Sequence, residues 1–305
     1  MVNAAPSPAM TVDDRHRRAL QLIADAAPGG PVPPAAPSRR VDEFPLRIAR
    51  DDLTAASLEQ GIADVGCVLL PNLLTTDTAA ELRDAIDRAF AGYDRYEGGS
   101  GTDDPWFDAY IPAPSTVHSA RPWLRGGGGL FTPDSPILAA RWFGLLRSTG
   151  ITALVAAVFG EEPITSLDKC SLRKVRAGEG IEWHQDGSFL GVDSGALNLW
   201  VSLSDTDDAP GLDMLPRRFT EIVETGSGGA GYGWSTGPEV VAELASGTGI
   251  ARPRFAAGDA LLFDGLLLHR TAQPPPDFSG VRYAIETWFF RPSWFPDHQQ
   301  VPIAL

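Results

Sequence analysis

The second half of the chain consists of short stretches rich in β-branched and aromatic residues, and turns containing glycine or proline separate these stretches. Such spacing is typical of strands in a sandwich or barrel. The first half carries helix signals instead. The sequence therefore predicts a mainly β protein of α+β type, a double-sheet barrel with helices packed on one face. The predicted strands are Ile164–Val175, Leu197–Leu203, Ile222–Thr225, Ala260–Leu268 and Arg282–Phe290.

Helix start and stop signals mark the first half. The strand-like run Gly66–Leu70 precedes a predicted helix whose N-cap is Asp77 or Thr78. A second helix is predicted to begin at Asp134-Ser135-Pro136, because proline is favourable at the first helical position. A third helix should cover Ile151–Phe159 and stop at the glycine that follows.

Between these helices, the stretch Tyr93–Leu130 is rich in glycine and aromatic residues. It is too long for an ordinary connection, which indicates a lid or a substrate loop. Arg121 and Arg125 lie beside its glycine run, Gly126–Gly129. They are either solvated surface charges or contacts for an anionic group of a substrate or cosubstrate.

Length and composition restrict the function classes. A chain of 305 residues with 43% hydrophobic residues can bury the core of one large domain or two small ones. The net charge of -14 disfavours nucleic acid and anionic membranes as partners, because an acidic surface repels phosphate groups. Cys67 and Cys170 are predicted to be free thiols. The sequence has no apolar run long enough to span a membrane and no signal-peptide pattern, so we expect a cytoplasmic location.

The N-terminal segment 1–42 is rich in alanine, proline and serine. The prolines between Pro31 and Pro37 break regular structure there, although Thr11–Ala26 could form a short helix. We therefore expect a flexible or surface-wrapped arm over residues 1–42, followed by a single domain over residues 43–305.

His184 and Asp186 are separated by one residue. On a strand, residues i and i+2 point to the same side, so this spacing would direct an imidazole and a carboxylate toward one point. His269 follows the apolar run Leu261–Leu268 and could supply a third ligand from another strand. Two histidines and one carboxylate suit non-haem Fe(II) and leave coordination positions open, although a single His-x-Asp also arises often by chance.

The distribution of histidines favours the metal interpretation. Of the five histidines, His16 lies in the arm, His298 near the end of the chain and His118 in the irregular stretch. Only His184 and His269 fall at the ends of predicted strands in the β-rich half.

Arg282 begins the last predicted strand, beyond the proline-rich turn that follows His269. A dicarboxylate cosubstrate needs a fixed cation for its distal carboxylate, and a guanidinium can hold it through two parallel hydrogen bonds. Arg270 and Arg291 are competitors for this role, but strand alternation points Arg270 away from His269. The same alternation puts Glu286 on the Arg282 face, where it needs a partner if it is buried.

These motifs resemble those of the phytanoyl-CoA dioxygenase family. The resemblance rests on His184-Gln185-Asp186, on His269-Arg270-Thr271 and on Arg282, and it extends to Gly66–Leu74 with the helix that follows. It covers roughly Leu53 to Pro296, nearly all of the predicted domain. The fold that it implies is a double-stranded β-helix, a jelly roll of the cupin-like kind.

The resemblance also implies the cofactors and the site. The ligands of Fe(II) would be His184, Asp186 and His269. Arg282 would bind the distal carboxylate of 2-oxoglutarate, in a pocket that Thr271 and Trp200 line. The reaction partners would be O2 and a small-molecule substrate, and no oligomeric state is implied.

One segment departs from the family pattern. Many members carry Pro-Gly-Ser-His beyond the strand that ends at Leu203, whereas this chain has Leu215-Pro216-Arg217-Arg218 there, so no substrate preference can be carried over. Related halogenases replace the carboxylate ligand with a small residue, and this chain retains Asp186. The expected reaction is therefore hydroxylation of an unactivated C–H bond in a lipid-like or secondary-metabolite substrate, with release of succinate and CO2.

Two other functions stay open at the level of the sequence. A cupin-type oxygenase or isomerase would use the same barrel and a metal without 2-oxoglutarate, and it would have no need of Arg282. A catalytically inactive barrel would only bind a small molecule, although the retention of all three metal-ligand candidates and of Arg282 argues against decay of the site.

Overall fold

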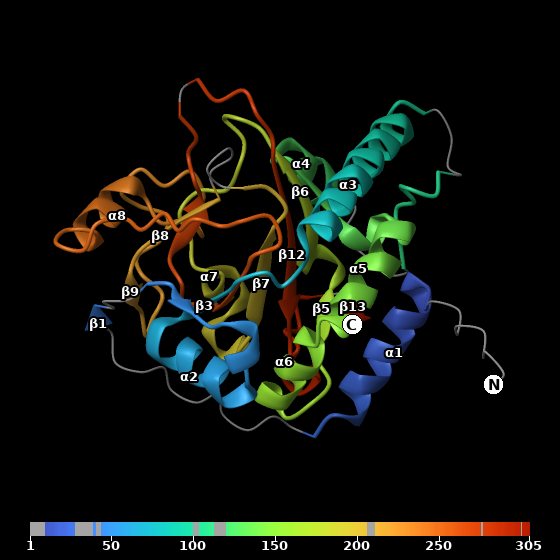
Figure 1. Ribbon diagram of the computed structural model, residues 1–305, viewed down its shortest axis with the longest axis horizontal. Coiled ribbons are helices and arrows are strands. Elements are labelled where there is room, and N and C mark those ends of the chain that lie inside the picture. Colours follow the sequence, from blue (N-terminus) through green and yellow to red (C-terminus); the bar gives the residue numbers. More distant parts are fainter. Residues whose placement is uncertain are drawn as a thin grey trace.

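A seven-stranded sheet runs through the middle of the protein (Figure 1). The computed structural model describes residues 10–27, 39–40, 44–99, 104–112, 120–205, 211–275, 277–299 and 301–305. In their order across the sheet, the strands are β2 (Leu46–Arg47), β3 (Cys67–Leu70), β10 (Ala260–Asp264), β7 (Leu197–Ser202), β12 (Arg282–Phe289), β6 (Cys170–Val175) and β4 (Gly129–Phe131). Neighbouring strands are antiparallel except β2 and β3, which are parallel.

Strand β7 forms the centre of this sheet. Its Leu199 pairs with Leu262 of β10 on one side and with Thr287 of β12 on the other, and every residue of β7 is buried. Successive side chains of a strand point to opposite faces, so Leu199 faces one side of the sheet while Asn198 and Trp200 face the other.

Helices cover the Leu199 face of the sheet (Figure 1). They are α2 (Ala55–Val65), α3 (Thr76–Glu97), α5 (Pro136–Ser148) and α6 (Ile151–Phe159). Apolar side chains on α3 and α5 recur at helical spacing and are buried in one core with Leu199. Trp142 of α5 is fully buried, and its Nε1–H donates to Oγ1 of Thr287 at 2.8 Å, which ties the helix layer to the sheet.

A smaller layer faces the other side of the sheet. Strand β8 (Leu212–Met214) pairs there with β11 (His269–Thr271), and a single bridge between His184 and His269 extends this pairing. Leu212 and Met214 share a second core with Trp200. The large sheet and this layer form the two sides of an open barrel, and α8 (Pro238–Leu244) lies beyond β8 (Figure 1).

The predicted helices are present, with one corrected N-terminus. Helix α5 begins at Pro136 and α6 covers Ile151–Phe159, as predicted. The N-cap of α3 is Thr75 and not Asp77 or Thr78, because Oγ1 of Thr75 accepts the backbone N–H of Thr78 at 3.1 Å. Among the described residues no single helix is long and apolar enough to cross a membrane; only α5 and α6 together, bent by 66°, pass that test of length and composition.

Three predicted strands require correction, and one of them, Ala260–Leu268, ends already at Asp264 because Gly265 and Leu266 form a turn. The strand predicted at Ile222–Thr225 is wrong, because this segment is irregular and the N–H of Val223 donates to Oε1 of Gln185 at 2.7 Å instead of to a neighbouring strand. The run Ile164–Val175 is not continuous. A 3₁₀ turn, η4 (Leu167–Lys169), divides it into β6 and β5 (Ile164–Ser166).

The described parts of the segment 1–42 lie against the body. Helix α1 (Val12–Asp25) packs on β13 (Pro302–Ala304), which pairs with β5. Nη1 of Arg15 donates to the carbonyl oxygen of Ala304 at 3.0 Å, and its guanidinium lies 4.7 Å from the centre of the Phe143 ring. Strand β1 (Arg39–Arg40) pairs with β9 (Arg217–Arg218). The described part of the arm, α1 and β1, therefore lies against the body. The prolines between Pro31 and Pro37, like His118, lie outside the described residues.

Arg121 and Arg125 both start from the short helix α4 (Ala120–Gly126) but have different surroundings. Arg121 is buried, and its Nε and Nη2 donate to the two oxygens of Asp134 at 2.6 and 2.8 Å. Burial raises the pKa of the Asp134 carboxyl, and Arg121 offsets part of that effect. Arg125 instead pairs with Asp94 on the surface at 2.9 Å. Arg121 is therefore neither a solvated charge nor a contact for a ligand anion. It connects α4 to Asp134, which follows β4 in the chain.

We expect Arg121→Met to lower the free energy of unfolding by about 3–5 kcal/mol, because it leaves the carboxyl of Asp134 buried without its cation. The matched control is Arg125→Met, which removes an ion pair whose carboxylate, Asp94, is exposed to solvent, and it should cost no more than about 1 kcal/mol. Urea denaturation followed by circular dichroism measures both values. Equal effects of the two substitutions would contradict a structural role for the buried pair.

Candidate active site

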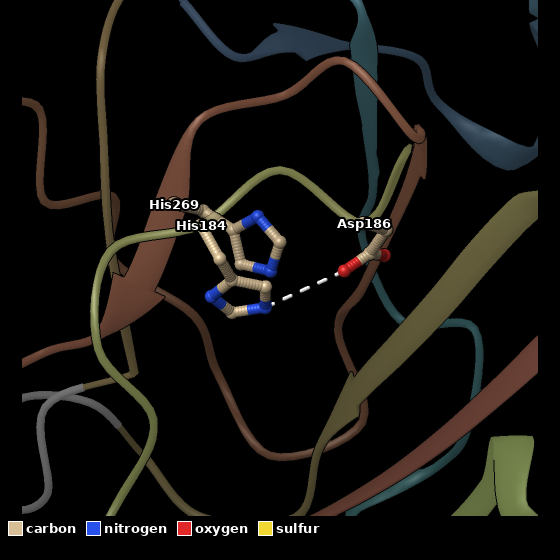
Figure 2. Close-up of side chains that lie close together, drawn as sticks. All are labelled: His184, Asp186 and His269. Carbon is tan, nitrogen blue, oxygen red and sulfur yellow. Dashed lines mark ion pairs between the residues drawn. The ribbon is translucent and has the colours of Figure 1, made fainter. Parts of the chain in front are cut away.

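His184 and His269 lie opposite each other in a short antiparallel bridge. The backbone N–H of His184 donates to the carbonyl oxygen of His269 at 2.9 Å, and the reverse bond measures 3.0 Å. The two imidazole rings are consequently neighbours, with centroids 4.3 Å apart (Figure 2). Backbone hydrogen bonds thus fix side by side two residues that are distant in the sequence.

Backbone carbonyls set the tautomer of both rings. Nδ1 of His184 lies 2.6 Å from the carbonyl oxygen of Glu182, and Nδ1 of His269 lies 3.0 Å from that of Leu267. A carbonyl oxygen only accepts, so Nδ1 is the donor in each ring. The Nε2 lone pairs are therefore available to a metal ion.

Asp186 completes a cluster of three possible ligands. Its Oδ1 lies 3.4 Å from Nε2 of His184 (Figure 2) and, although buried, has no hydrogen-bond partner among the described residues. Its Oδ2 accepts Nδ2–H of Asn198 at 3.0 Å. The three ligand atoms lie within 4.8 Å of one another. Lone pairs of nitrogen and oxygen that converge without a proton between them fit a bound cation, and two histidines with one carboxylate suit Fe(II).

The surroundings favour the protonation states that a metal requires. Burial, followed by the proximity of His184, lowers the pKa of His269 to about 4, so this imidazole is neutral at pH 7. Burial opposes the charged form of Asp186, but its interactions with His184, His269 and Asn198 hold the pKa of the carboxyl below its usual value. A neutral imidazole and an ionised carboxylate are the metal-binding forms of these side chains.

The segment around His184 and Asp186 is not the strand that its spacing predicted. Only His184 takes part in a bridge, and Asp186 has helical backbone angles (φ -58°, ψ -32°) as the N-cap of α7 (Gly187–Leu190). Gln185 holds this turn: it is 1% exposed, and its Nε2 donates to the carbonyl oxygen of Leu266 at 2.8 Å. The two side chains converge because the chain turns, and not because a strand alternates.

A cavity of about 310 Å³ opens beside the three possible ligands, and all three line it. Thr271 lines the same cavity. Polar and charged side chains line it together with five aromatic ones other than histidine: Trp123, Phe131, Phe189, Trp234 and Trp288.

Arg282 and Trp200 lie together behind the cavity wall and are not among the described residues that line it. The guanidinium of Arg282 lies 5.8 Å from the centre of the Trp200 ring. Arg282 is 4% exposed; its Nη1 donates to the carbonyl oxygen of Gly211 at 2.8 Å, and its Nε has no partner among the described residues. Burial lowers the pKa of Arg282 to about 10, which still leaves the side chain charged at pH 7.

Arg270 and Glu286 have partners of their own. Nε of Arg270 donates to Oδ2 of Asp213 at 2.9 Å, and Arg270 does not line the cavity with His269. Glu286 lines the cavity and is bound by Arg173, whose Nε and Nη2 both donate to Oε2 at 3.0 and 2.8 Å. The half-buried carboxylate on the Arg282 face therefore has a partner in Arg173.

The sequence analysis missed several residues of the site, among them Asn198, Trp234, Lys169 and Arg173. Asn198 orients Asp186, and its signal was a single amide within an otherwise largely apolar strand. Trp234 and Lys169 line the cavity from outside the strands. Nothing in their local sequence marks them, because only the fold brings them to the cavity.

The chain is similar to known proteins both in sequence and in fold. The family model described as phytanoyl-CoA dioxygenase (PhyH) matches residues 62–274. No curated protein sequence matches significantly. Among solved structures, EctD from S. alaskensis with 2-oxoglutarate and 5-hydroxyectoine has a TM-score of 0.51 and 19% identity, over 85% of this chain and 86% of EctD. The apoform of EctD has a TM-score of 0.53 and 18% identity, over 88% and 92% of the two chains.

AviO1 from Streptomyces viridochromogenes Tue57 is similar at the same level, with a TM-score of 0.51 and 17% identity over 80% of this chain and 98% of AviO1. At these identities the likeness concerns the fold, and it confirms the predicted cupin-like jelly roll with packed helices. The family match covers well over half of the chain and confirms the resemblance seen in the motifs. The protein therefore belongs to the phytanoyl-CoA dioxygenase family and is an oxygenase that uses Fe(II) and 2-oxoglutarate.

Proposed function

We propose that the protein is a dioxygenase that hydroxylates an unactivated C–H bond of a small-molecule substrate. The observation that carries the proposal is the convergence of three buried ligand atoms, among them the unpartnered Oδ1 of Asp186, at the wall of a cavity that five aromatic side chains help to line. One atom of O2 would enter the product, and the other would enter the succinate that forms from 2-oxoglutarate with release of CO2. The relative crystallised with 2-oxoglutarate and 5-hydroxyectoine supports a reaction of this class.

Fe(II) held by His184, Asp186 and His269 would supply, when bound, the activation of O2 that is coupled to decarboxylation of 2-oxoglutarate. The protein's own groups prepare this site. The two backbone carbonyls hold the proton of each neutral imidazole on Nδ1, so that Nε2 presents its lone pair to the metal position. Asn198 fixes Oδ2 of Asp186 and so aims Oδ1 at the position between the imidazoles.

We assign the distal carboxylate of 2-oxoglutarate to Arg282. A buried guanidinium with a free Nε–H among the described residues is suited to a carboxylate, because charge-assisted hydrogen bonds are the strong ones. Glu286 is close enough to Arg282 to influence its pKa and would repel a dicarboxylate. Arg173 offsets that repulsion through its two hydrogen bonds to Glu286, so a net positive charge is left for the cosubstrate.

The aromatic walls would hold the substrate and keep water from the reacting carbon. Burying an apolar body against them contributes roughly 25 cal/mol per Å² of covered surface. The cavity of about 310 Å³ is near the lower end of the range of ligand pockets, so the part of the substrate inside it is small. We expect the aromatic side chains to contribute to catalysis mainly by orienting one C–H bond of the substrate toward the metal position.

The first test is anaerobic titration of the purified protein with Fe(II) and then with 2-oxoglutarate. We expect the visible charge-transfer band of the chelate in the wild type, and loss or weakening of the band in Arg282→Ala because the distal carboxylate loses its cation. The control is Arg291→Ala, which removes an arginine whose guanidinium lies over Phe159, away from the cavity.

Each other outcome of this titration selects a different function. Iron binding without any band would favour a cupin-type metal enzyme that does not use 2-oxoglutarate. Absence of iron binding would favour an inactive, ligand-binding barrel. His184→Ala should abolish turnover and weaken Fe(II) binding, and wild-type activity in that variant would overturn the metal assignment.

Asn198→Leu should weaken Fe(II) binding by about 10- to 100-fold, because it leaves Oδ2 of Asp186 without its donor and frees the carboxylate to rotate. Anaerobic competition with a chromophoric chelator measures the dissociation constant. Circular dichroism and thermal unfolding of the variant serve as controls for the fold. An unchanged dissociation constant in a folded variant would show that Asn198 does not position the ligand.

A further inference from the structure

A row of aromatic rings leads away from the metal-ligand cluster. The ring of Phe189 stacks on His184 at a centroid distance of 6.1 Å, and Trp288 stacks on Phe189 at 5.5 Å. Trp234 stands edge-on to both His184 and Phe189, at 5.7 Å from each. All four side chains line the cavity, so a flat or ring-shaped apolar body can lie along this row with one end at the metal position.

Lys169 lies beside this row, next to Phe189 and Trp288. Its Nζ is 5.3 Å from the centre of the Phe189 ring and 5.0 Å from that of Trp288, and it also lines the cavity. The side chain comes from η4, the turn that interrupts the predicted strand Ile164–Val175. Phe189 is therefore close both to His184 of the cluster and to the ammonium group of Lys169.

Of the described positively charged side chains that line this cavity, Lys169 is the one with donors available to bind a ligand. Among the described residues that line the cavity, Lys169 and Arg173 carry the positive charges. Arg173 uses Nε and Nη2 for Glu286, so its guanidinium is engaged. An ammonium has three donors, and Lys169 has one carboxylate contact, with Oδ2 of Asp168 at 3.2 Å.

Asp168 does not depend on Lys169. Its Oδ1 accepts the hydroxyl of Ser166 at 2.6 Å. The side-chain amide of Gln299, oriented as its neighbours require, donates to the same carboxylate at 2.9 Å. Asp168 can therefore orient the ammonium group and keep its own hydrogen bonds when Lys169 binds a ligand.

We propose that the substrate of this oxygenase is a small organic anion, with an apolar ring-sized body against Phe189 and Trp234 and a carboxylate that Lys169 binds. This inference rests on the proposed function and names its substrate class.

A cationic substrate fits these surroundings less well. An aromatic wall beside carboxylates can attract an organic cation. Here the ammonium group of Lys169 already lies over the two rings that a cation would use, and a second cation would meet its charge. A neutral substrate would offer Lys169 no carboxylate besides that of Asp168, so its remaining donors would not make the stronger hydrogen bonds that an anion allows.

The test uses three probes that share one ring: phenylacetate, phenylacetamide and 2-phenylethylamine. Each is titrated by calorimetry into the anaerobic protein loaded with Fe(II) and 2-oxoglutarate, and the visible band of the chelate is followed to verify that the cosubstrate stays bound. We expect phenylacetate to bind most tightly. In Lys169→Met its affinity should fall by about 10- to 100-fold, the usual size of a charge-assisted contact, and Lys169→Arg should retain most of it.

The chain offers a closely matched control, because it has only two lysines. Lys174 is also paired with an aspartate, Asp87, and also lies over an aromatic ring, that of Phe90, but it does not line the cavity. Lys174→Met should leave the affinity for phenylacetate unchanged.

Three outcomes would overturn the inference: no preference for the acid, no binding of any probe, or equal affinities in wild type and Lys169→Met. In these cases the chelate band is present, so the proposed function itself stands. Absence of the band in the wild type would overturn the proposed function, and the inference with it.

Discussion

The reciprocal backbone hydrogen bonds between His184 and His269 are the constraint on which the site depends. They fix the register between two segments that are far apart in the sequence, and a slip of one residue would turn both rings to the opposite side. Each histidine also donates from Nδ1 to the carbonyl two residues before it, at Glu182 and Leu267. The same short pairing therefore sets the position, the orientation and the tautomer of both rings.

Much of the fold and the centre of the site could be predicted from the sequence. Helices α5 and α6 were found from capping residues and periodicity, and β7, β10 and β12 from apolar runs, because these signals are local. Asp186 was placed correctly beside His184 for the wrong reason, since a turn held by Gln185 replaces the predicted strand. Side chains such as Lys169 could not be assigned, because tertiary packing alone brings them to the cavity.

Several arginine side chains are buried in the fold, although the net charge of the chain is -14. Arg121 is buried with Asp134, and Arg173 is buried against Glu286. Arg282 differs, because its partners among the described residues are a carbonyl oxygen and the face of Trp200 and not a carboxylate. A buried cation without an anion is costly, and binding an anion recovers part of that cost. The acidic exterior thus encloses an interior that is locally suited to anions.

Gln185, the middle residue of the His184–Asp186 segment, connects the metal-ligand cluster to a distant part of the chain. Its side chain bonds the backbone of Glu221, Val223 and Leu266. The chain then continues from Val223 to Trp234, which stands edge-on to His184. Substitutions in this loop that touch no ligand can therefore displace the imidazole through Gln185. Mutations in this loop that are selected because they favour a new substrate would also change the affinity for the metal. Substrate preference and metal affinity would therefore change together during evolution.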